Sequence, residues 1–210
     1  MIQYKETKKL YQGIYQHRIV LVAPGCHVFR GNNIESALAR IIKQEELSDL
    51  SNASSYYPFV RKKTEIAFLY EIYDCLKDLE NYTIRVEGVW LSIYSNNDRD
   101  ISKIRRIRPD HVKSIYSPPK PLTDGEIISN VPYDFKVTLR NIDKDHSAFV
   151  EWAKSNENIK LLKSCEDSLT YYKKYLNSPS YFYVKGEKTL LMTKIHLGDV
   201  IRVVERIVKP

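Results

Sequence analysis

The apolar residues of the first 80 positions switch between strand spacing and helix spacing. Residues 18–22 form a short apolar run that a Pro-Gly pair ends, which predicts a buried strand. An asparagine pair that can cap a helix precedes apolar positions on one helical face over residues 34–42, and the Ser- and Asn-rich residues 46–57 predict a loop. From residue 61 or 64 to residue 80, apolar residues recur three and four apart, which predicts an amphipathic helix.

The middle of the chain predicts a pair of strands, a helix and a further strand. The apolar alternation over residues 84–93 changes phase at Gly88, which predicts a bulge or a tight hairpin there. Residues 98–107 return to helical spacing, with isoleucines inward and basic residues outward. Residues 111–116 predict a strand, and the three prolines within 118–121 predict an extended loop.

Short strands and helices alternate in the last third of the chain. They are expected at residues 133–139 (strand), 148–153 (helix), 159–162 (strand) and 166–176 (helix). Residues 181–184 and 189–197 predict a β-hairpin around a Lys-Gly-Glu-Lys turn. Residues 199–208 fit either a helix capped by Asp199 or a valine-rich strand, and both alternatives stay open.

This mixture predicts an α+β fold in which mixed or antiparallel sheets pack against helices, with two ferredoxin-like (split βαβ) halves as one arrangement. We expect one compact unit over residues 1–210, with a subdivision into 1–80 and 81–210 as the alternative. With 43% hydrophobic and 28% charged residues the chain has the composition of a folded protein. The sequence shows no membrane span and no secretory signal, and its three cysteines are far apart, so we expect reduced thiols and a cytoplasmic location.

The net charge of +7 is concentrated in two segments. Residues 99–120 contain 7 basic and 2 acidic side chains, and residues 160–210 contain 10 and 5. Five basic side chains of the first segment are expected to face outward, where they can neutralise several phosphates. These residues are Lys103, Arg105, Arg106, Arg108 and Lys113. An ordinary solvated helix face is the alternative explanation.

The second segment carries aromatic residues at strand spacing. Tyr181, Tyr183 and Lys185 fall on one face of a predicted strand, where rings can stack on bases and the lysine can meet a phosphate. Together with the basic helix, this strand predicts that DNA or RNA is the partner. The 16 tyrosines of the chain also suit protein recognition, so a viral or host protein is the alternative partner.

Candidate catalytic chemistry is sparse. Asp143, Asp145 and His146 place oxygen and nitrogen ligands within four positions, which could hold a divalent ion in a nuclease, although a capped turn explains Asp145 equally well. Cys26 and His27 are adjacent, but neighbouring residues on a strand point to opposite faces. Motifs for phosphate loops, dinucleotides, serine hydrolases and zinc peptidases are absent from the sequence, so we expect no cofactor and no catalytic residue.

Several segments are similar to small accessory proteins of unassigned role in tailed bacteriophages. These segments are Val20–Pro24 followed by Phe29–Gly31, Ser92–Asn97, Asp134–Leu139 and Tyr181–Lys188. The resemblance covers most of the chain and implies a viral source and a bacterial cytoplasm. The sequence as a whole therefore predicts a non-enzymatic, phage-type nucleic-acid-binding protein, with a protein-interaction or virion component and a metal-dependent nuclease as alternatives.

Overall fold

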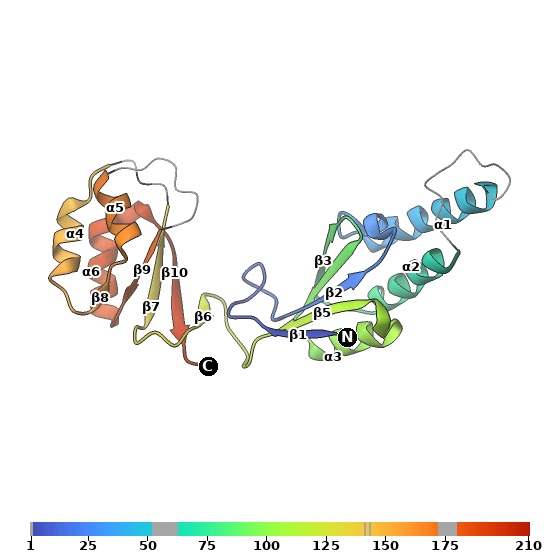
Figure 1. Ribbon diagram of the computed structural model, residues 1–210, viewed down its shortest axis with the longest axis horizontal. Helices are drawn as coiled ribbons and strands as arrows, with labels where there is room; N and C mark the ends of the chain where they lie inside the picture. Colours follow the sequence, from blue (N-terminus) through green and yellow to red (C-terminus); the bar gives the residue numbers. More distant parts are fainter. Residues whose placement is uncertain (1, 52–62, 141, 143, 172–179) are drawn as a thin grey trace. The chain divides into compact units, whose positions relative to one another are not determined.

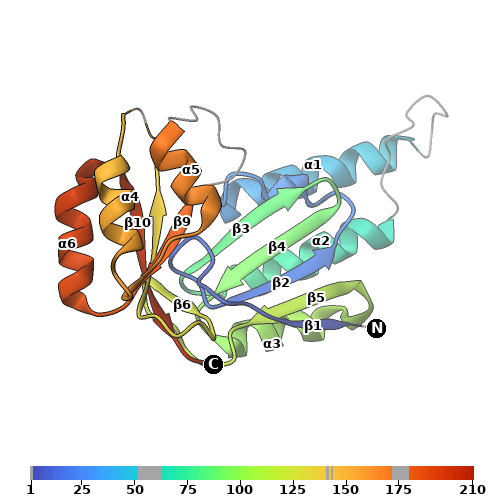
Figure 2. The same cartoon turned by 60° about the vertical axis from the view of Figure 1, so that its left-hand side comes forward.

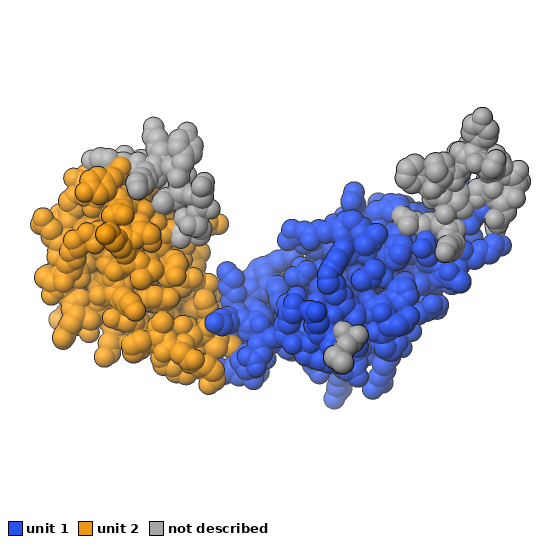
Figure 3. All heavy atoms as spheres, in the orientation of Figure 1, with its two compact units in different colours: residues 1–122 blue, residues 123–210 orange. Residues whose placement is uncertain are grey.

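The computed structural model describes residues 2–51, 63–140, 142, 144–171 and 180–210. The chain forms two compact units, unit 1 over Met1–Leu122 and unit 2 over Thr123–Pro210, which Figure 3 distinguishes by colour. The division falls just after the proline-rich segment. The alternative boundary at residue 80 lies inside unit 1, between helix α2 (Lys63–Leu76) and strand β3 (Tyr82–Glu87).

Unit 1 contains five strands and three helices among its described residues. In chain order they are β1 (Gln3–Glu6), β2 (His17–Val22), α1 (Ile34–Ser51), α2 (Lys63–Leu76), β3 (Tyr82–Glu87), β4 (Trp90–Ser95), α3 (Asp98–Ile107) and β5 (Val112–Ser117). Two short 3-10 helices, Cys26–Phe29 and Pro109–His111, complete the unit. The predicted tight hairpin is confirmed at Gly88, which turns between β3 and β4 with φ of 61°.

The sheet of unit 1 has the strand order β1-β5-β2-β4-β3. Strands β5, β2, β4 and β3 are antiparallel neighbours, and helices connect β2 to β3 and β4 to β5. This is the split βαβ arrangement of ferredoxin-like folds. Strand β1 extends it by pairing in parallel with β5.

All three helices of unit 1 pack on one face of this sheet, as Figure 2 shows. The core on that face joins Ile19 and Leu21 of β2, Ile93 of β4, Phe68 of α2 and Ile104 of α3. Side chains alternate along a strand. The residues between these core positions therefore point to the opposite face, which no described helix of unit 1 covers and which we call the open face.

Unit 2 repeats the same strand order. Its elements are β6 (Glu126–Ile128), β7 (Phe135–Leu139), α4 (Ser147–Lys154), β8 (Ile159–Lys160), α5 (Lys163–Tyr171), β9 (Tyr181–Val184), α6 (Glu187–Leu197), a 3-10 turn (Gly198–Val200) and β10 (Ile201–Val208). The sheet order is β6-β10-β7-β9-β8, in which the last four strands are antiparallel and β6 pairs in parallel with β10. The α+β fold and its two ferredoxin-like halves are thus confirmed, each half with one added strand.

The helices of unit 2 also lie on one side of their sheet (Figure 1). Val137 of β7 and Phe182 of β9 are fully buried against Phe149 of α4 and Leu169 of α5. The alternate residues of β7 and β9 consequently occupy an open face, as they do in unit 1.

Two sequence-based expectations are wrong. Residues 189–197 belong to helix α6 and do not form a strand, because the buried Leu190, Thr193 and Leu197 follow a helical stripe that exposed apolar neighbours obscure. Helix α1 continues through Ser51, where a loop was expected from residue 46, because α1 packs along α2 and tertiary contacts override weak propensity. Some expected features lie outside the described residues: residues 52–57 of that loop, the alternative helix start at residue 61, and residues 172–176 of the helix expected over residues 166–176. Residues 201–208 adopt the strand alternative.

Candidate nucleic-acid interface

Helix α3 presents the basic residues that the sequence singled out. Its first turn is capped by Asn97, whose side-chain oxygen accepts a hydrogen bond from the backbone N–H of Arg99 at 3.0 Å. Lys103 Nζ lies 3.2 Å from a carboxylate oxygen of Asp78, and Arg105 donates a 2.7 Å hydrogen bond to the hydroxyl of Tyr4. Arg106 is exposed and, among the described residues, makes no ion pair. The helix therefore offers fewer uncommitted cations than its sequence indicates.

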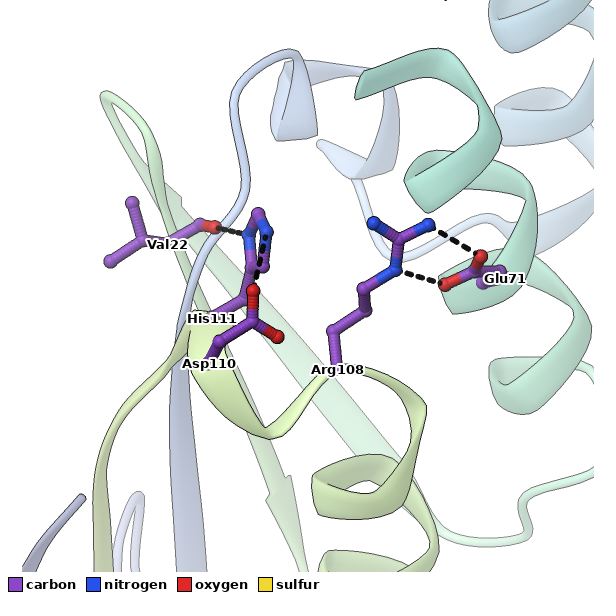
Figure 4. A network of polar contacts seen from close by, with 5 residues as sticks. All are labelled: Val22, Glu71, Arg108, Asp110 and His111. Carbon is purple, nitrogen blue, oxygen red and sulfur yellow. Dashed lines mark hydrogen bonds and ion pairs between the residues drawn. The ribbon is translucent and has the colours of Figure 1, made fainter. Parts of the chain in front are cut away.

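Arg108 joins the end of α3 to α2 (Figure 4). Its Nε and one terminal nitrogen donate to the two carboxylate oxygens of Glu71 at 2.9 and 2.8 Å, a bidentate pair that raises the pKa of Arg108. Next to it, His111 Nδ1 lies 2.9 Å from the carbonyl oxygen of Val22, so this nitrogen carries the proton that it donates. Arg108 would have to release Glu71 before it could bind a phosphate in the same way.

Helix α3 and the open face lie on opposite sides of the unit 1 sheet. Ile101 and Ile104 anchor α3 in the core, whereas Lys113 of β5 lies on the other side, with its Nζ 2.9 Å from the ring centre of Trp90. A short strand of nucleic acid lying flat on one of these surfaces therefore does not touch the other.

A row of cations and tyrosines crosses the open face of unit 1 from strand to strand. The register pairs Lys5 of β1 with Tyr116 of β5, Tyr116 with Arg18 of β2, and Arg18 with Tyr94 of β4. The Arg18 guanidinium carbon lies 5.3 Å from the ring centre of Tyr116 and 5.7 Å from that of Tyr94. Lys5 Nζ lies 5.6 Å from the Tyr116 ring centre. Cation–π attraction thus holds the row together.

The segment before β2 adds a further ring to this row. Tyr11 lies over it, with its ring centre 5.3 Å from that of Tyr94 and 6.0 Å from the Arg18 guanidinium. Ser92 of β4 also holds the Arg18 guanidinium, whose Nε and a terminal nitrogen donate hydrogen bonds to the Ser92 hydroxyl at 3.3 and 2.9 Å. Tyr94 is buried under these groups, while Tyr11, Arg18 and Tyr116 stay partly exposed. We call Lys5, Tyr11, Arg18, Tyr94 and Tyr116 the unit 1 platform.

The unit 1 platform has a positive local potential. A hydrogen bond with the Ser114 side chain and the charges of Lys5 and Arg18 lower the pKa of Tyr116, whereas burial raises the pKa of Tyr11. No ion pair of the described residues includes Lys5 or Arg18. Their charges are therefore available to an anionic ligand.

In unit 2, the structure places Tyr181 and Tyr183 together on the open face of β9, where they alternate along the strand with the buried Phe182 and Val184. Their ring centres are 5.7 Å apart. Lys136 of β7 lies beside them, with its Nζ 4.7 Å from the Tyr181 ring centre. Lys185 follows the strand and is exposed.

The sequence-based interpretation missed the unit 1 platform. The signal was present in each strand separately, because Arg18, Tyr94 and Tyr116 each adjoin a buried isoleucine and so fall on the opposite face. Nothing in the sequence shows that these three residues become neighbours. Their proximity depends on pairing between strands more than 70 residues apart.

The other chemical candidates have structural roles where they are described. The carboxylate of Asp145 accepts hydrogen bonds from the backbone N–H and the hydroxyl of Ser147 at the start of α4, and these bonds lower its pKa. Asp143 lies outside the described residues. Within the described part of the chain there is no group of three or more His, Cys, Asp or Glu side chains suited to a metal ion. Cys26 is fully buried, whereas His27 is exposed and its Nε2 lies 2.7 Å from the side-chain nitrogen of Gln44.

Comparison of the chain with protein-family models, with curated proteins and with solved structures finds no match. The resemblance to phage accessory proteins therefore stays a prediction. Among the helices of the described residues, none is long and apolar enough to cross a membrane.

Proposed function

We propose that the chain binds single-stranded nucleic acid on the open face of unit 1, without catalysing a reaction on it. The observation that carries the proposal is the row of Lys5, Tyr116, Arg18 and Tyr94 across four strands of an uncovered sheet. Aromatic rings stack on bases of any sequence, and nearby cations attract the phosphates.

The fold supports the same proposal. Four-stranded βαββαβ sheets with aromatic residues on their central strands stack two or three bases in RNA-recognition modules. In unit 1 the two central strands are β2 and β4, which carry Arg18 and Tyr94. The partly exposed rings of Tyr11 and Tyr116 lie next to each other, with their centres 6.4 Å apart, and each is within 6.0 Å of the Arg18 guanidinium, so a planar base has a surface to stack on and a cation beside it.

Single strands fit this platform better than a duplex does. Stacking requires a base whose face is free, and the bases of a duplex are already stacked on one another. No described helix of unit 1 projects from the open face to enter a groove. We therefore expect little dependence on base sequence. The basic residues of α3, on the other side of the sheet, remain candidates for separate contacts with phosphates.

Photo-crosslinking locates the bound strand. A single strand containing 5-bromouracil, irradiated in complex with the full chain and analysed by mass spectrometry, is expected to attach to peptides that contain Tyr11 or Tyr116. Crosslinks confined to the peptides of α3 would place the binding surface on the helix side and reject the platform.

A second candidate function is protein recognition through helix α6. Leu191 and Ile195 lie one turn apart and are 59% and 67% exposed, with Met192 beside them. Exposed apolar groups of this kind mark interaction surfaces. Light scattering of the wild type and of the Leu191→Lys variant tests this function: a wild-type oligomer that the variant dissociates supports it, and a wild-type monomer at high concentration counts against it.

A further inference from the structure

The two units carry equivalent residue pairs at equivalent positions of one fold. In unit 1, the first open-face residue of β2, Arg18, pairs across the sheet with Tyr94 of β4. In unit 2, the first open-face residue of β7, Lys136, pairs with Tyr183 of β9. The strands correspond, because β2 and β7 each begin the βαββαβ sequence and β4 and β9 are each its third strand.

The segments before these first strands correspond as well. Tyr11 precedes β2 and packs on Tyr94 with a ring-centre distance of 5.3 Å. Tyr133 precedes β7 and stacks on Tyr183 at 5.9 Å, with an angle of 25° between the ring planes. Each unit therefore builds a platform from a cation, a tyrosine of the third strand and a tyrosine placed over it. We call Tyr133, Lys136, Tyr181 and Tyr183 the unit 2 platform.

The platforms differ in charge at one position. Where the fourth strand of unit 1 places Tyr116 beside Arg18, the fourth strand of unit 2 places Glu205 beside Lys136. A carboxylate oxygen of Glu205 lies 3.4 Å from Lys136 Nζ, and both side chains are mostly buried. The pair largely cancels the Lys136 charge, while Lys160 of β8, paired with Tyr183, is exposed at the sheet edge. Stacking thus dominates in the unit 2 platform, and phosphate attraction dominates in the unit 1 platform.

We propose that one single strand of nucleic acid binds both platforms of the same chain, the unit 1 platform supplying the salt-dependent contacts and the unit 2 platform additional base stacking. This inference rests on the proposed function. Once a strand is bound to one platform, binding to the other is intramolecular and is favoured by a high effective concentration. The affinity should therefore rise steeply with strand length. A longer strand also offers more positions at which a single site can bind, and we expect the rise in affinity to exceed this statistical gain.

The experiment compares the affinity of the full chain for single strands of about 8 and about 30 nucleotides. The shorter strand is about as long as the stretch of nucleotides that one binding site covers. A strand of about 30 nucleotides offers about 23 positions to a site of about 8, so we expect the affinity of the wild type for the longer strand to exceed this statistical gain by at least about tenfold. Tyr183→Ala should remove most of this excess and lower the affinity for the shorter strand by a smaller factor, because that strand still binds the unit 1 platform. Circular dichroism confirms the fold of each variant.

Glu205→Gln provides an independent variant that keeps the ring surface. Removal of the carboxylate frees the Lys136 charge, so the salt dependence for the longer strand should steepen by about 0.7, the value for one phosphate contact on a single strand. An equal length effect in the wild type and in Tyr183→Ala, with an unchanged slope in Glu205→Gln, would overturn the two-platform inference and leave the proposed function intact. Absence of binding to either length would reject the proposed function itself.

Discussion

Arg18 is the residue whose replacement should weaken binding most. Its guanidinium lies within 6.0 Å of the ring centres of Tyr11, Tyr94 and Tyr116 and makes no ion pair among the described residues. A hydrogen bond to a charged group contributes about 1.5–3 kcal/mol, so Arg18→Ala should raise the Kd about 10- to 140-fold. If Arg18 meets one phosphate, the slope of log K against log salt should also become shallower by about 0.7.

The same substitution has a cost in stability that must be measured separately. Each ring contact of an arginine contributes about 0.5–1 kcal/mol at an exposed site, so the loss of the contacts with Tyr11, Tyr94 and Tyr116 should lower the free energy of unfolding of Arg18→Ala by about 1.5–3 kcal/mol. Denaturant titration followed by circular dichroism measures this change. A chain with the stability of a typical domain stays folded under binding conditions after a loss of this size in its free energy of unfolding.

Two further variants separate charge from geometry. Arg18→Lys keeps the positive charge but loses the planar group that stacks on the rings, so the affinity should fall while the salt slope is unchanged. Arg85→Ala is the matched control, because Arg85 lies on the same open face but is ion-paired with Glu87 at the sheet edge. Fluorescence anisotropy over a salt series measures all three variants. A folded Arg18→Ala variant with wild-type affinity and slope would refute the role of the unit 1 platform.

Further predictions concern the neighbouring surfaces. Phe182→Ala should lower the free energy of unfolding by about 3–5 kcal/mol in a denaturant titration, because its ring is fully buried, whereas Tyr183→Ala on the open face should lower it by about 1–3 kcal/mol, because it removes only the ring contacts with Tyr133 and Tyr181. Arg105→Ala combined with Arg106→Ala should change the Kd for a short strand less than Arg18→Ala does, because α3 lies on the other side of the sheet; a loss as large would move the site to α3. Because the pKa of Tyr116 is lowered, its phenol should ionise at a lower pH than an ordinary tyrosine and then repel phosphate. Binding should therefore weaken as the pH rises toward that pKa, and Tyr116→Phe should reduce this dependence; an identical pH profile in the variant would contradict the assignment.

Local patterns predict most of the secondary structure of this chain. Helices α2 and α3 follow directly from apolar residues spaced three and four apart, and the hairpin at Gly88 follows from a change of phase. Helix α6 was missed because Leu191 and Ile195 are apolar and exposed, so the stripe that contacts the core is not distinguishable by residue type. Local patterns therefore fail where an apolar residue does not face the core.

The candidate site depends on contacts that local patterns do not contain. Arg108 looks like an available cation in sequence, but it pairs with Glu71, which lies 37 residues earlier. Conversely, Arg18 and Tyr94 look unremarkable alone and become neighbours only through the register of β2 and β4. The expected α+β halves could be predicted from the order of elements, whereas the face that carries the cations and rings required the strand pairing.

The most direct test of the central claim is the affinity of the full chain for single-stranded and duplex oligonucleotides of the same length and sequence, measured by fluorescence anisotropy at low and at physiological salt. The platform predicts tighter binding of the single strand at both salt concentrations, since only unpaired bases can stack on Tyr11 and Tyr116. Binding of neither form at low salt, or tighter binding of the duplex, would contradict the account.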